Sequence, residues 1–174
     1  MKLRDFDIDR DFDVVKTWIT DEKTHAMWSA FRFQYPLDKE DFGKVLGDFT
    51  ARYGDRPTVA ELTDGTVVGF FSYSGCRELN EGRLAFIVVS PDHRGKGIAG
   101  QMLHLAIDRA FEDPDVALVA LNVFSSNPRA RKCYEKVGFR QRRVEEKAFP
   151  YHEEAWDRVN MIVTRENVSG QGLS

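Results

Sequence analysis

The stretch VVSPDHRGKGIAGQML, residues 88–103, decides the fold of this protein. An apolar run over 83–89 leads into a loop with a glycine on each side of Lys96, and an apolar stripe with helical spacing then fills 98–111. A second apolar run over 116–124 has the length of another buried strand. Strand, helix and strand in this order predict a βαβ unit, whose two strands lie parallel with a right-handed crossover.

The loop in front of this helix has the chemistry of a phosphate site. Backbone N–H groups in the first turn of a helix lack intrahelical partners, and the helix dipole favours an anion there. Gly95 and Gly97 allow the backbone to approach such an anion closely, while Arg94 and Lys96 add positive charge. A Walker loop is excluded because Gly97 follows Lys96 where Ser or Thr is needed. A dinucleotide fingerprint is excluded because no ribose-binding acid follows the second strand.

The N-terminal third of the chain predicts two helices and one edge strand. Residues 3–8 favour a short edge strand, and Asp11 is expected to open a helix. The aromatic segment 20–36 is irregular, so we expect a loop with a possible helical turn. A second helix is expected between Asp38, as its cap, and Gly54, as its end.

The remaining elements complete an α/β fold with a mixed sheet. They are a hairpin around Asp64-Gly65, a helix from Asn127 to Gly138, and strands around 139–149 and 154–163. The last two strands are expected to form an antiparallel flank beside the parallel pair.

Length and composition fit one domain over 1–165 with a flexible tail over 166–174. The formal net charge of -3 disfavours a surface built to bind nucleic acid. No apolar run of about 18 residues is present, and the start is too charged for a signal peptide, so we expect a cytoplasmic protein without membrane partners. Cys76 and Cys133 lack the spacing of a metal site, so we expect two buried thiols and no metal.

Two motifs resemble the GNAT superfamily of N-acetyltransferases. VVSPDHRGKGIA is similar to the signature R/Q-x-x-G-x-G/A, matched by Arg94, Gly97 and Ala99. LNVFSSNPRARKCYEKVGF, residues 121–139, resembles the next strand and helix of the same superfamily. The similarity covers roughly 57–163. It implies the GNAT-like fold, a central and mostly antiparallel mixed sheet with one parallel βαβ pair, and acetyl-CoA as co-substrate without a metal.

The resemblance also implies where acetyl-CoA binds. Its pyrophosphate is expected on the loop amides, and its pantetheine arm between the two parallel strands. The implied binding residues are Ile87, Val88, Val89, Arg94, Gly95, Lys96, Gly97, Ile98, Ala99 and Asn127. Asn127 has the alternative role of a plain helix cap.

Tyr134 and Asn122 are the predicted catalytic residues. The resemblance places Tyr134 near the sulfur, where a phenol of pKa about 10 can protonate the leaving thiolate, although core packing is an alternative role. Asn122 stands where some relatives carry a carboxylate, and an amide can orient a water or the substrate amine without acting as a base. The general base stays open among Glu61, Glu81, Asp157, His152 and water. A backbone N–H of the strand 83–89 is expected to meet the developing oxyanion.

The acceptor pocket is expected between the aromatic segment before Pro36 and the last hairpin, with Trp28, Phe31 and His152 as candidate substrate-binding residues. The function implied is acetyl transfer from acetyl-CoA to a primary amine, of a small molecule or a protein N-terminus, by direct attack. Two alternatives stay open, the same fold with a different acyl-CoA and a non-catalytic CoA-binding regulator. An exposed edge strand or the last hairpin would allow a homodimer.

Overall fold

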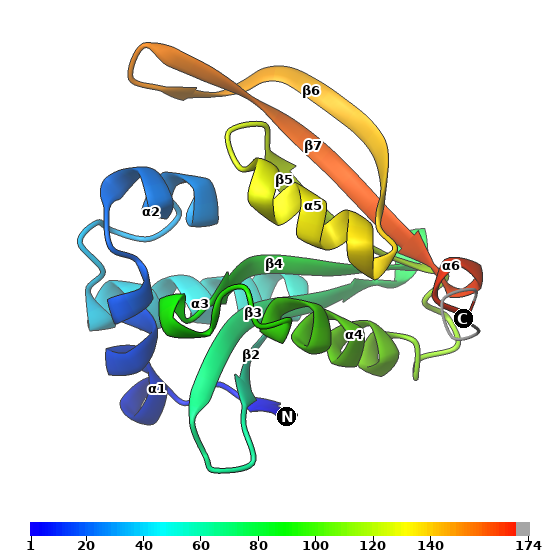
Figure 1. Ribbon diagram of the computed structural model, residues 1–174, viewed down its shortest axis with the longest axis horizontal. Helices are drawn as coiled ribbons and strands as arrows, with labels where there is room; N and C mark the ends of the chain where they lie inside the picture. Colours follow the sequence, from blue (N-terminus) through cyan, green and yellow to red (C-terminus); the bar gives the residue numbers. More distant parts are fainter. Residues whose placement is uncertain (170–174) are drawn as a thin grey trace.

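A central sheet organises residues 1–169, the part of the chain that the computed structural model describes (Figure 1). Its seven strands are β1 (Lys2–Asp5), β2 (Arg56–Glu61), β3 (Val67–Cys76), β4 (Glu81–Val89), β5 (Leu118–Phe124), β6 (Arg140–Tyr151) and β7 (Glu154–Thr164). Their spatial order in this part of the chain is β1-β2-β3-β4-β5-β7-β6. Within the described residues β4 and β5 pair parallel and the other neighbours pair antiparallel, which confirms the predicted mixed sheet.

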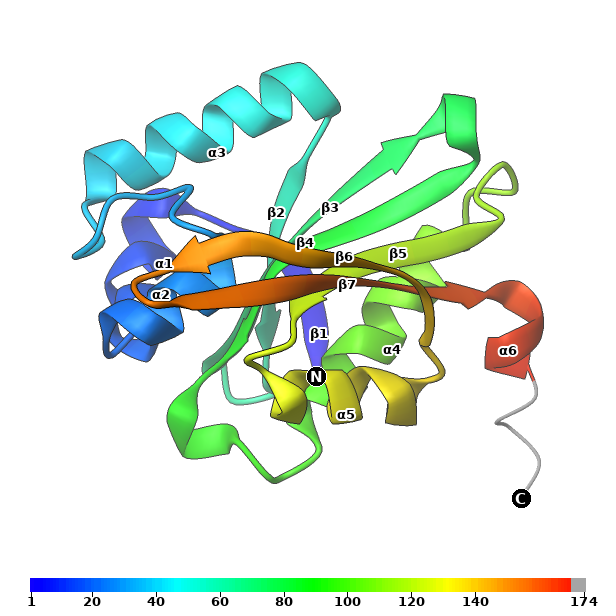
Figure 2. The same cartoon turned by 90° about the horizontal axis from the view of Figure 1, so that it is seen from above.

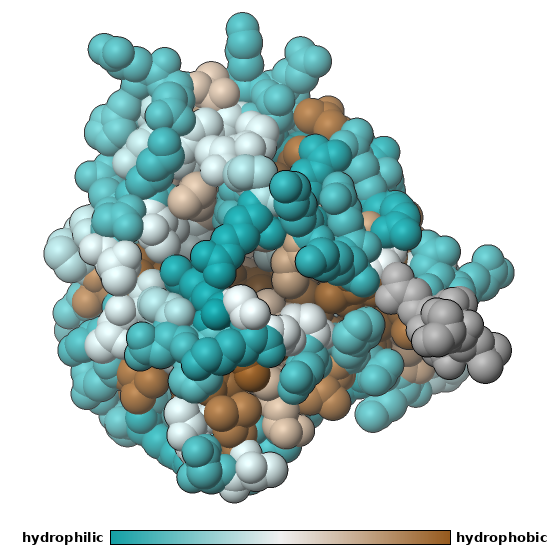
Figure 3. Space-filling view, viewed as in Figure 1, coloured by the Kyte–Doolittle hydropathy of each residue, from teal (hydrophilic) through white to brown (hydrophobic). Residues whose placement is uncertain are grey.

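Helices cover both faces of the sheet (Figure 2). One face carries α1 (Ile8–Val15), α2 (Glu22–Ser29) and α3 (Lys39–Tyr53), and the other carries α4 (Ile98–Ala110) and α5 (Pro128–Val137). Short turns η1, η2 and η3 lie at Lys16–Trp18, Arg77–Leu79 and Pro91–His93, and α6 spans Arg165–Ser169. Each face has its own buried cluster, around Phe42 and Phe70 under α3 and around Met102 and Leu121 under α4 and α5. The surface on the α4 and α5 side is mostly hydrophilic, with smaller apolar areas (Figure 3).

The parallel strands separate after a short paired segment. Only Glu81–Arg83 of β4 pair with Leu118–Ala120 of β5. The register between β3 and β4 shifts next to Phe86, whose φ of 53° is unusual for a residue other than glycine. The indole Nε1 of Trp28 donates to the carbonyl oxygen of Phe86 at 2.8 Å. This contact ties α2 to the irregular part of β4, and the sheet is open between β4 and β5 beyond Arg83.

The prediction that Asp11 opens the first helix is wrong. Helix α1 begins at Ile8, and its cap is Asp7, whose carboxylate accepts from the N–H groups of Asp9 and Arg10 at 2.9 and 3.1 Å. Asp11 lies inside the helix and is fully buried, because Arg4 of β1 donates two hydrogen bonds of 2.7 Å to its carboxylate. The sequence pattern places an acid before Phe12, but the partner that allows its burial comes from another element.

The prediction of a loop with a helical turn over 20–36 is wrong for Glu22–Ser29, because these eight residues form helix α2. The Asp21 carboxylate caps this helix through the N–H of Thr24 at 2.8 Å. The aromatic spacing looks irregular because Trp28 lies on the helix while Phe31 and Phe33 follow its left-handed end. One helical period therefore does not describe the whole segment.

Two further predictions concern the thiols and the C-terminus. Cys133 is half-buried, but Cys76 is exposed at the end of β3, so the prediction of two buried thiols is wrong for Cys76. The segment predicted as a tail from 166 begins within helix α6, and residues 170–174 lie outside the described residues. Among the described helices, none has the length and apolar character required to span a membrane.

Candidate active site

Two glycines allow the backbone conformation of the phosphate loop, the segment 90–97 between β4 and α4. Gly95 and Gly97 have φ values of 77° and 78°, in the left-handed region that favours glycine. A Cβ built on either residue would meet no atom within 4 Å, so the space in front of the loop is open. Gly97 is the cap residue of α4 and provides no side-chain bond to its first turn. The amides of the first turn of α4 therefore have no side-chain cap, and the anion site that the sequence predicts there stays a prediction.

The open edge of β4 continues the site from this loop toward the centre of the sheet. Ile87, Val88 and Val89 follow the last residue of β4 that pairs with β5, so this edge of β4 lacks a strand partner among residues 1–169, and the carbonyl oxygen of Val89 accepts from Nε of Arg94 at 3.3 Å. Ser126 lies in the turn between β5 and α5, and its Oγ is buried without a hydrogen-bond partner in that range. Free backbone groups and an orphaned hydroxyl are what a pantetheine arm, with its amide groups, would satisfy.

Asn127 lies beside this turn and caps α5. Its Oδ1 accepts from the N–H of Ala130 at 3.1 Å, as the sequence predicts for a helix cap. The side-chain oxygen is thereby engaged, and the amide N–H groups of Asn127 are what it can offer to a ligand.

Tyr134 lies on α5, on the side of the sheet that carries α4. Its side chain is 7% exposed, and its ring meets that of Phe139 edge-on at 6.1 Å. Burial raises the pKa of its hydroxyl, because the charged phenolate is poorly solvated there. Within the described residues this hydroxyl makes no hydrogen bond, and its oxygen is not among the fully buried polar atoms that lack a partner. Tyr134 thus combines the packing role with a neutral phenol that is available as a proton donor.

A cavity of about 310 Å³ opens on the opposite face, at the point where β4 and β5 separate. Its lining includes Trp28, Ser29, Arg32, Phe49, Tyr53, Asp55, Arg83, Ala85, Phe86, Asn122, Phe124 and Arg158. The strand residues come from β4 and β5 on both sides of the separation and, for Arg158, from β7, and the helix residues come from α2 and α3. The cavity therefore lies across the sheet from Tyr134, beside the aromatic segment before Pro36 but away from the tip of the last hairpin.

Asn122 lines this cavity and is exposed to it. Its Oδ1 accepts from Nδ2 of Asn160 on β7 at 2.9 Å. Trp28 also lines the cavity, while its predicted companion Phe31 is 43% exposed and contacts the ring of Tyr151 at 6.3 Å, away from the lining. His152 lies at the tip of the last hairpin, 3.2 Å from Glu22, and does not line the cavity.

The base candidates of the sequence lie elsewhere. Glu61 receives hydrogen bonds from Arg4 and Arg10, and the Arg4 guanidinium lowers the pKa of Glu61 to about 2. Glu81 pairs with Arg142, and Asp157 accepts from a backbone N–H at 2.9 Å on the last hairpin. Like His152, none of these carboxylates is part of the cavity lining.

Asp55 is the carboxylate that the cavity does contain, and sequence reasoning missed it. It is 3% exposed, and Ser72 of β3 donates to its Oδ2 at 2.9 Å. Its Oδ1 is buried without a partner among the described residues. The only sequence signal is an acid directly after the helix end Gly54 and before a buried strand. That signal is indistinguishable from an ordinary turn.

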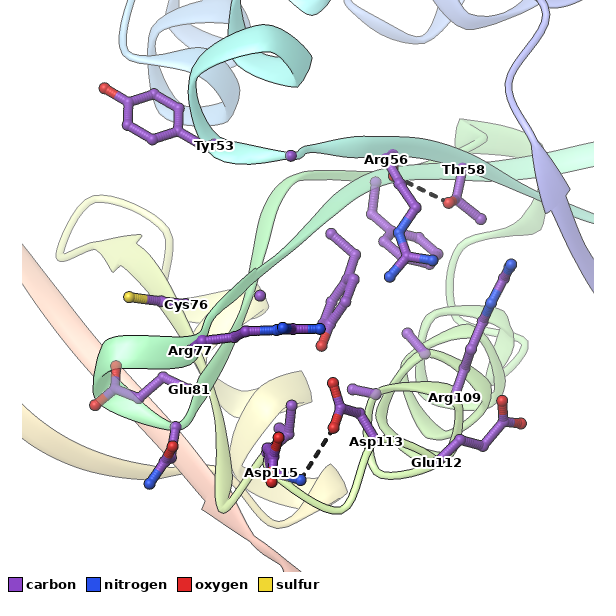
Figure 4. Close-up of a pocket in the computed structure, with 18 residues that line it drawn as sticks. Tyr53, Arg56, Thr58, Cys76, Arg77, Glu81, Arg109, Glu112, Asp113 and Asp115 are labelled. Atoms are coloured by element: carbon purple, nitrogen blue, oxygen red, sulfur yellow. Dashed lines mark hydrogen bonds between the residues drawn. The ribbon is translucent and has the colours of Figure 1, made fainter.

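A second cavity of about 560 Å³ lies at the other end of α4 (Figure 4). Arg56 and Arg77 extend into it, and Asp113 points toward them from the end of α4. Neither the phosphate loop nor Tyr134 nor Asn122 belongs to its lining. We therefore assign the chemistry to the smaller cavity.

The chain is similar to known proteins in sequence and in structure. The sequence profile of the Acetyltransferase (GNAT) family matches residues 17–139. An uncharacterised N-acetyltransferase of Methanocaldococcus jannaschii is 30% identical over 141 residues, which cover 81% of this chain and 83% of that protein. Spermidine N(1)-acetyltransferase of Vibrio cholerae is 27% identical over 111 residues, 63% of this chain and 64% of that protein. The structure of spermidine N-acetyltransferase from Vibrio cholerae in complex with CoA and spermine aligns with a TM-score of 0.80 at 19% identity and covers 97% of each chain.

Proposed function

Because the chain belongs to the GNAT acetyltransferase family and is an N-acetyltransferase for an amine, we propose that it transfers acetyl from acetyl-CoA to a primary amine of a small molecule by direct attack. One observation carries this proposal. β4 and β5 separate beyond Arg83, and residues of both strands on either side of this separation line the smaller cavity, while Tyr134 lies on the helix side of the opposite face. Donor and acceptor would therefore meet inside the sheet without a covalent enzyme intermediate.

The chain's own groups would hold the donor along one continuous path. The amides from Arg94 to Ala99 would bind the pyrophosphate, supported by the charge of Lys96. The free edge of β4 over 87–89 and the hydroxyl of Ser126 would bind the pantetheine arm. Acetyl-CoA, when bound, supplies an activated thioester.

Tyr134 would protonate the departing thiolate. Its raised pKa keeps the phenol neutral at pH 7, so the proton is present when it is needed. Its unpartnered hydroxyl needs no competing bond to be broken first.

Asp55 would receive a proton of the acceptor amine, directly or through one water. A primary amine of pKa about 10 is protonated at pH 7 and must lose a proton before it attacks. Asp55 belongs to the cavity lining, its buried Oδ1 is a hydrogen-bond acceptor without a partner among the described residues, and Ser72 donates to the other oxygen. We expect Asp55→Asn to raise KM for the amine and to lower kcat/KM by about 100-fold, the scale of general base catalysis. Unchanged kcat/KM and an unchanged pH profile would remove Asp55 from the mechanism.

A CoA-binding regulator without turnover and an enzyme with a different acyl donor are the competing functions. Thiol release from acetyl-CoA, measured against a panel of amines with a no-amine control, separates these functions from the proposal. Turnover with one chemical class of amine supports the transferase. Calorimetric CoA binding without thiol release for any amine contradicts it. Faster thiol release from a longer acyl-CoA than from acetyl-CoA would show that the donor is that acyl-CoA.

A further inference from the structure

Asn122 lines the acceptor cavity, and its amide oxygen is engaged by Asn160, so its amide nitrogen is the group left for a ligand. A chain of side chains from neighbouring strands fixes this orientation. Arg142 of β6 has only donors, and its Nε lies 2.7 Å from Oδ1 of Asn160 on β7. Nδ2 of Asn160 must then donate, and it meets Oδ1 of Asn122 at 2.9 Å. The Asn122 oxygen is thus engaged outside the cavity, and its two N–H groups are left for a ligand.

The arginine that begins this chain is itself held in place. Glu81 of β4 accepts from Nη1 of Arg142 at 2.5 Å. Asn160 is 6% exposed and also donates to the carbonyl oxygen of Leu121 at 3.3 Å, so it cannot turn over without losing bonds. Contacts between side chains of the sheet therefore fix the orientation of the Asn122 amide, with its N–H groups free to donate.

Arginines add further donors to the same wall. Arg83 lines the cavity from β4, lies 5.8 Å from the centre of the Tyr53 ring, and makes no ion pair within residues 1–169. Arg32 lines it from the segment after α2, also without an ion pair in the described part of the chain. Arg158 is neutralised by Glu145 outside the lining, at 3.1 Å from Nε. Asp55 is the one carboxylate in the lining, so Arg32 and Arg83 leave the cavity with excess positive charge.

We infer that the acceptor is an amine that also carries a carboxylate, bound by Arg83 and the Asn122 amide nitrogen with the amine toward Asp55. This inference rests on the proposed function, whose substrate class it narrows. A carboxylate fits donors in this arrangement because it accepts from an arginine and a neighbouring amide at once. A polyamine would place its second cation against Arg83 and Arg32, where like charges repel. The volume of about 310 Å³ suits a molecule of amino-acid size.

The first test compares amines that differ only in the carboxylate. Phenylalanine is paired with phenethylamine and 4-aminobutyrate with butylamine, and spermidine is included as a polyamine. We expect the carboxylate member of at least one pair to have a kcat/KM about 100-fold higher, and spermidine to be a poor acceptor. Equal rates within both pairs, or spermidine as the best acceptor, would overturn the inference and leave the transferase intact.

The second test measures binding, so that it does not depend on turnover. With CoA present, Arg83→Gln should weaken calorimetric binding of the preferred carboxylate amine by about 10- to 100-fold and leave its carboxylate-free partner unchanged. Arg77→Gln is the matched control, since Arg77 is an exposed arginine of the other cavity. Equal binding by wild type and Arg83→Gln contradicts the inference. Normal carboxylate-amine binding without thiol release contradicts the proposed function alone.

Discussion

Tyr134→Phe tests the proposed chemistry most directly. The ring fills its place beside Phe139, and its hydroxyl has no hydrogen-bond partner among the described residues, so removal of the oxygen leaves no buried group unpaired. The free energy of unfolding should therefore change by less than about 1 kcal/mol. A general acid contributes about 10²- to 10⁴-fold to a rate, which corresponds to about 2.7–5.4 kcal/mol of barrier. We expect kcat to fall by this factor while the Kd of CoA stays unchanged.

The assay is thiol release at saturating acetyl-CoA and amine, with calorimetric CoA binding and thermal unfolding of the same preparations. Burial raises the pKa of Tyr134, so wild-type kcat should show no decline from its deprotonation up to about pH 9. A kcat within about threefold of wild type would refute the role of Tyr134. If the affinity for CoA fell by the same factor as kcat, the hydroxyl would contribute to CoA binding, which would contradict a role in proton donation alone.

Two further predictions address the phosphate loop and the N-terminal ion-pair network. Gly97→Val should weaken CoA binding at least about 10-fold, because a β-branched residue cannot keep a φ of 78° without strain. Gly65→Val is the control, since Gly65 has a φ of 89° in the β2–β3 turn. It should lower the free energy of unfolding by a similar amount and leave CoA affinity unchanged. Equal CoA affinity of Gly97→Val and Gly65→Val would exclude the phosphate loop as the site that binds the pyrophosphate of CoA. Arg4 lowers the pKa of Glu61 to about 2, so the stability that Glu61 contributes is present above about pH 4.5 and is lost as the pH falls toward 2. Glu61→Gln should flatten the pH dependence of urea unfolding over that interval, and an unchanged slope would contradict the pairing.

The errors of sequence reasoning in the N-terminal third have a common physical cause. Asp11 has the spacing of a helix cap, and its burial inside α1 is favourable because Arg4 from β1 donates two hydrogen bonds to it, in addition to the N–H of Asp7. The segment 20–36 carries its aromatic residues on both a helix and the chain that follows it, so no single period is visible. Local patterns cannot report such contacts because the partners lie on other elements.

The sequence by itself determined the βαβ unit, the glycine loop before α4 and the cap of α5. Each is local, since apolar periodicity, the left-handed glycines and the Asn127 cap act within a few residues of one another. Only the tertiary structure decided which groups face the acceptor. Asp55 becomes the cavity carboxylate because β3 places Ser72 beside it, and Asn122 becomes a donor because Arg142 and Asn160 reach it from two other strands. Which atom donates and which accepts is fixed by side chains on neighbouring strands, so no residue spacing along the chain predicts it.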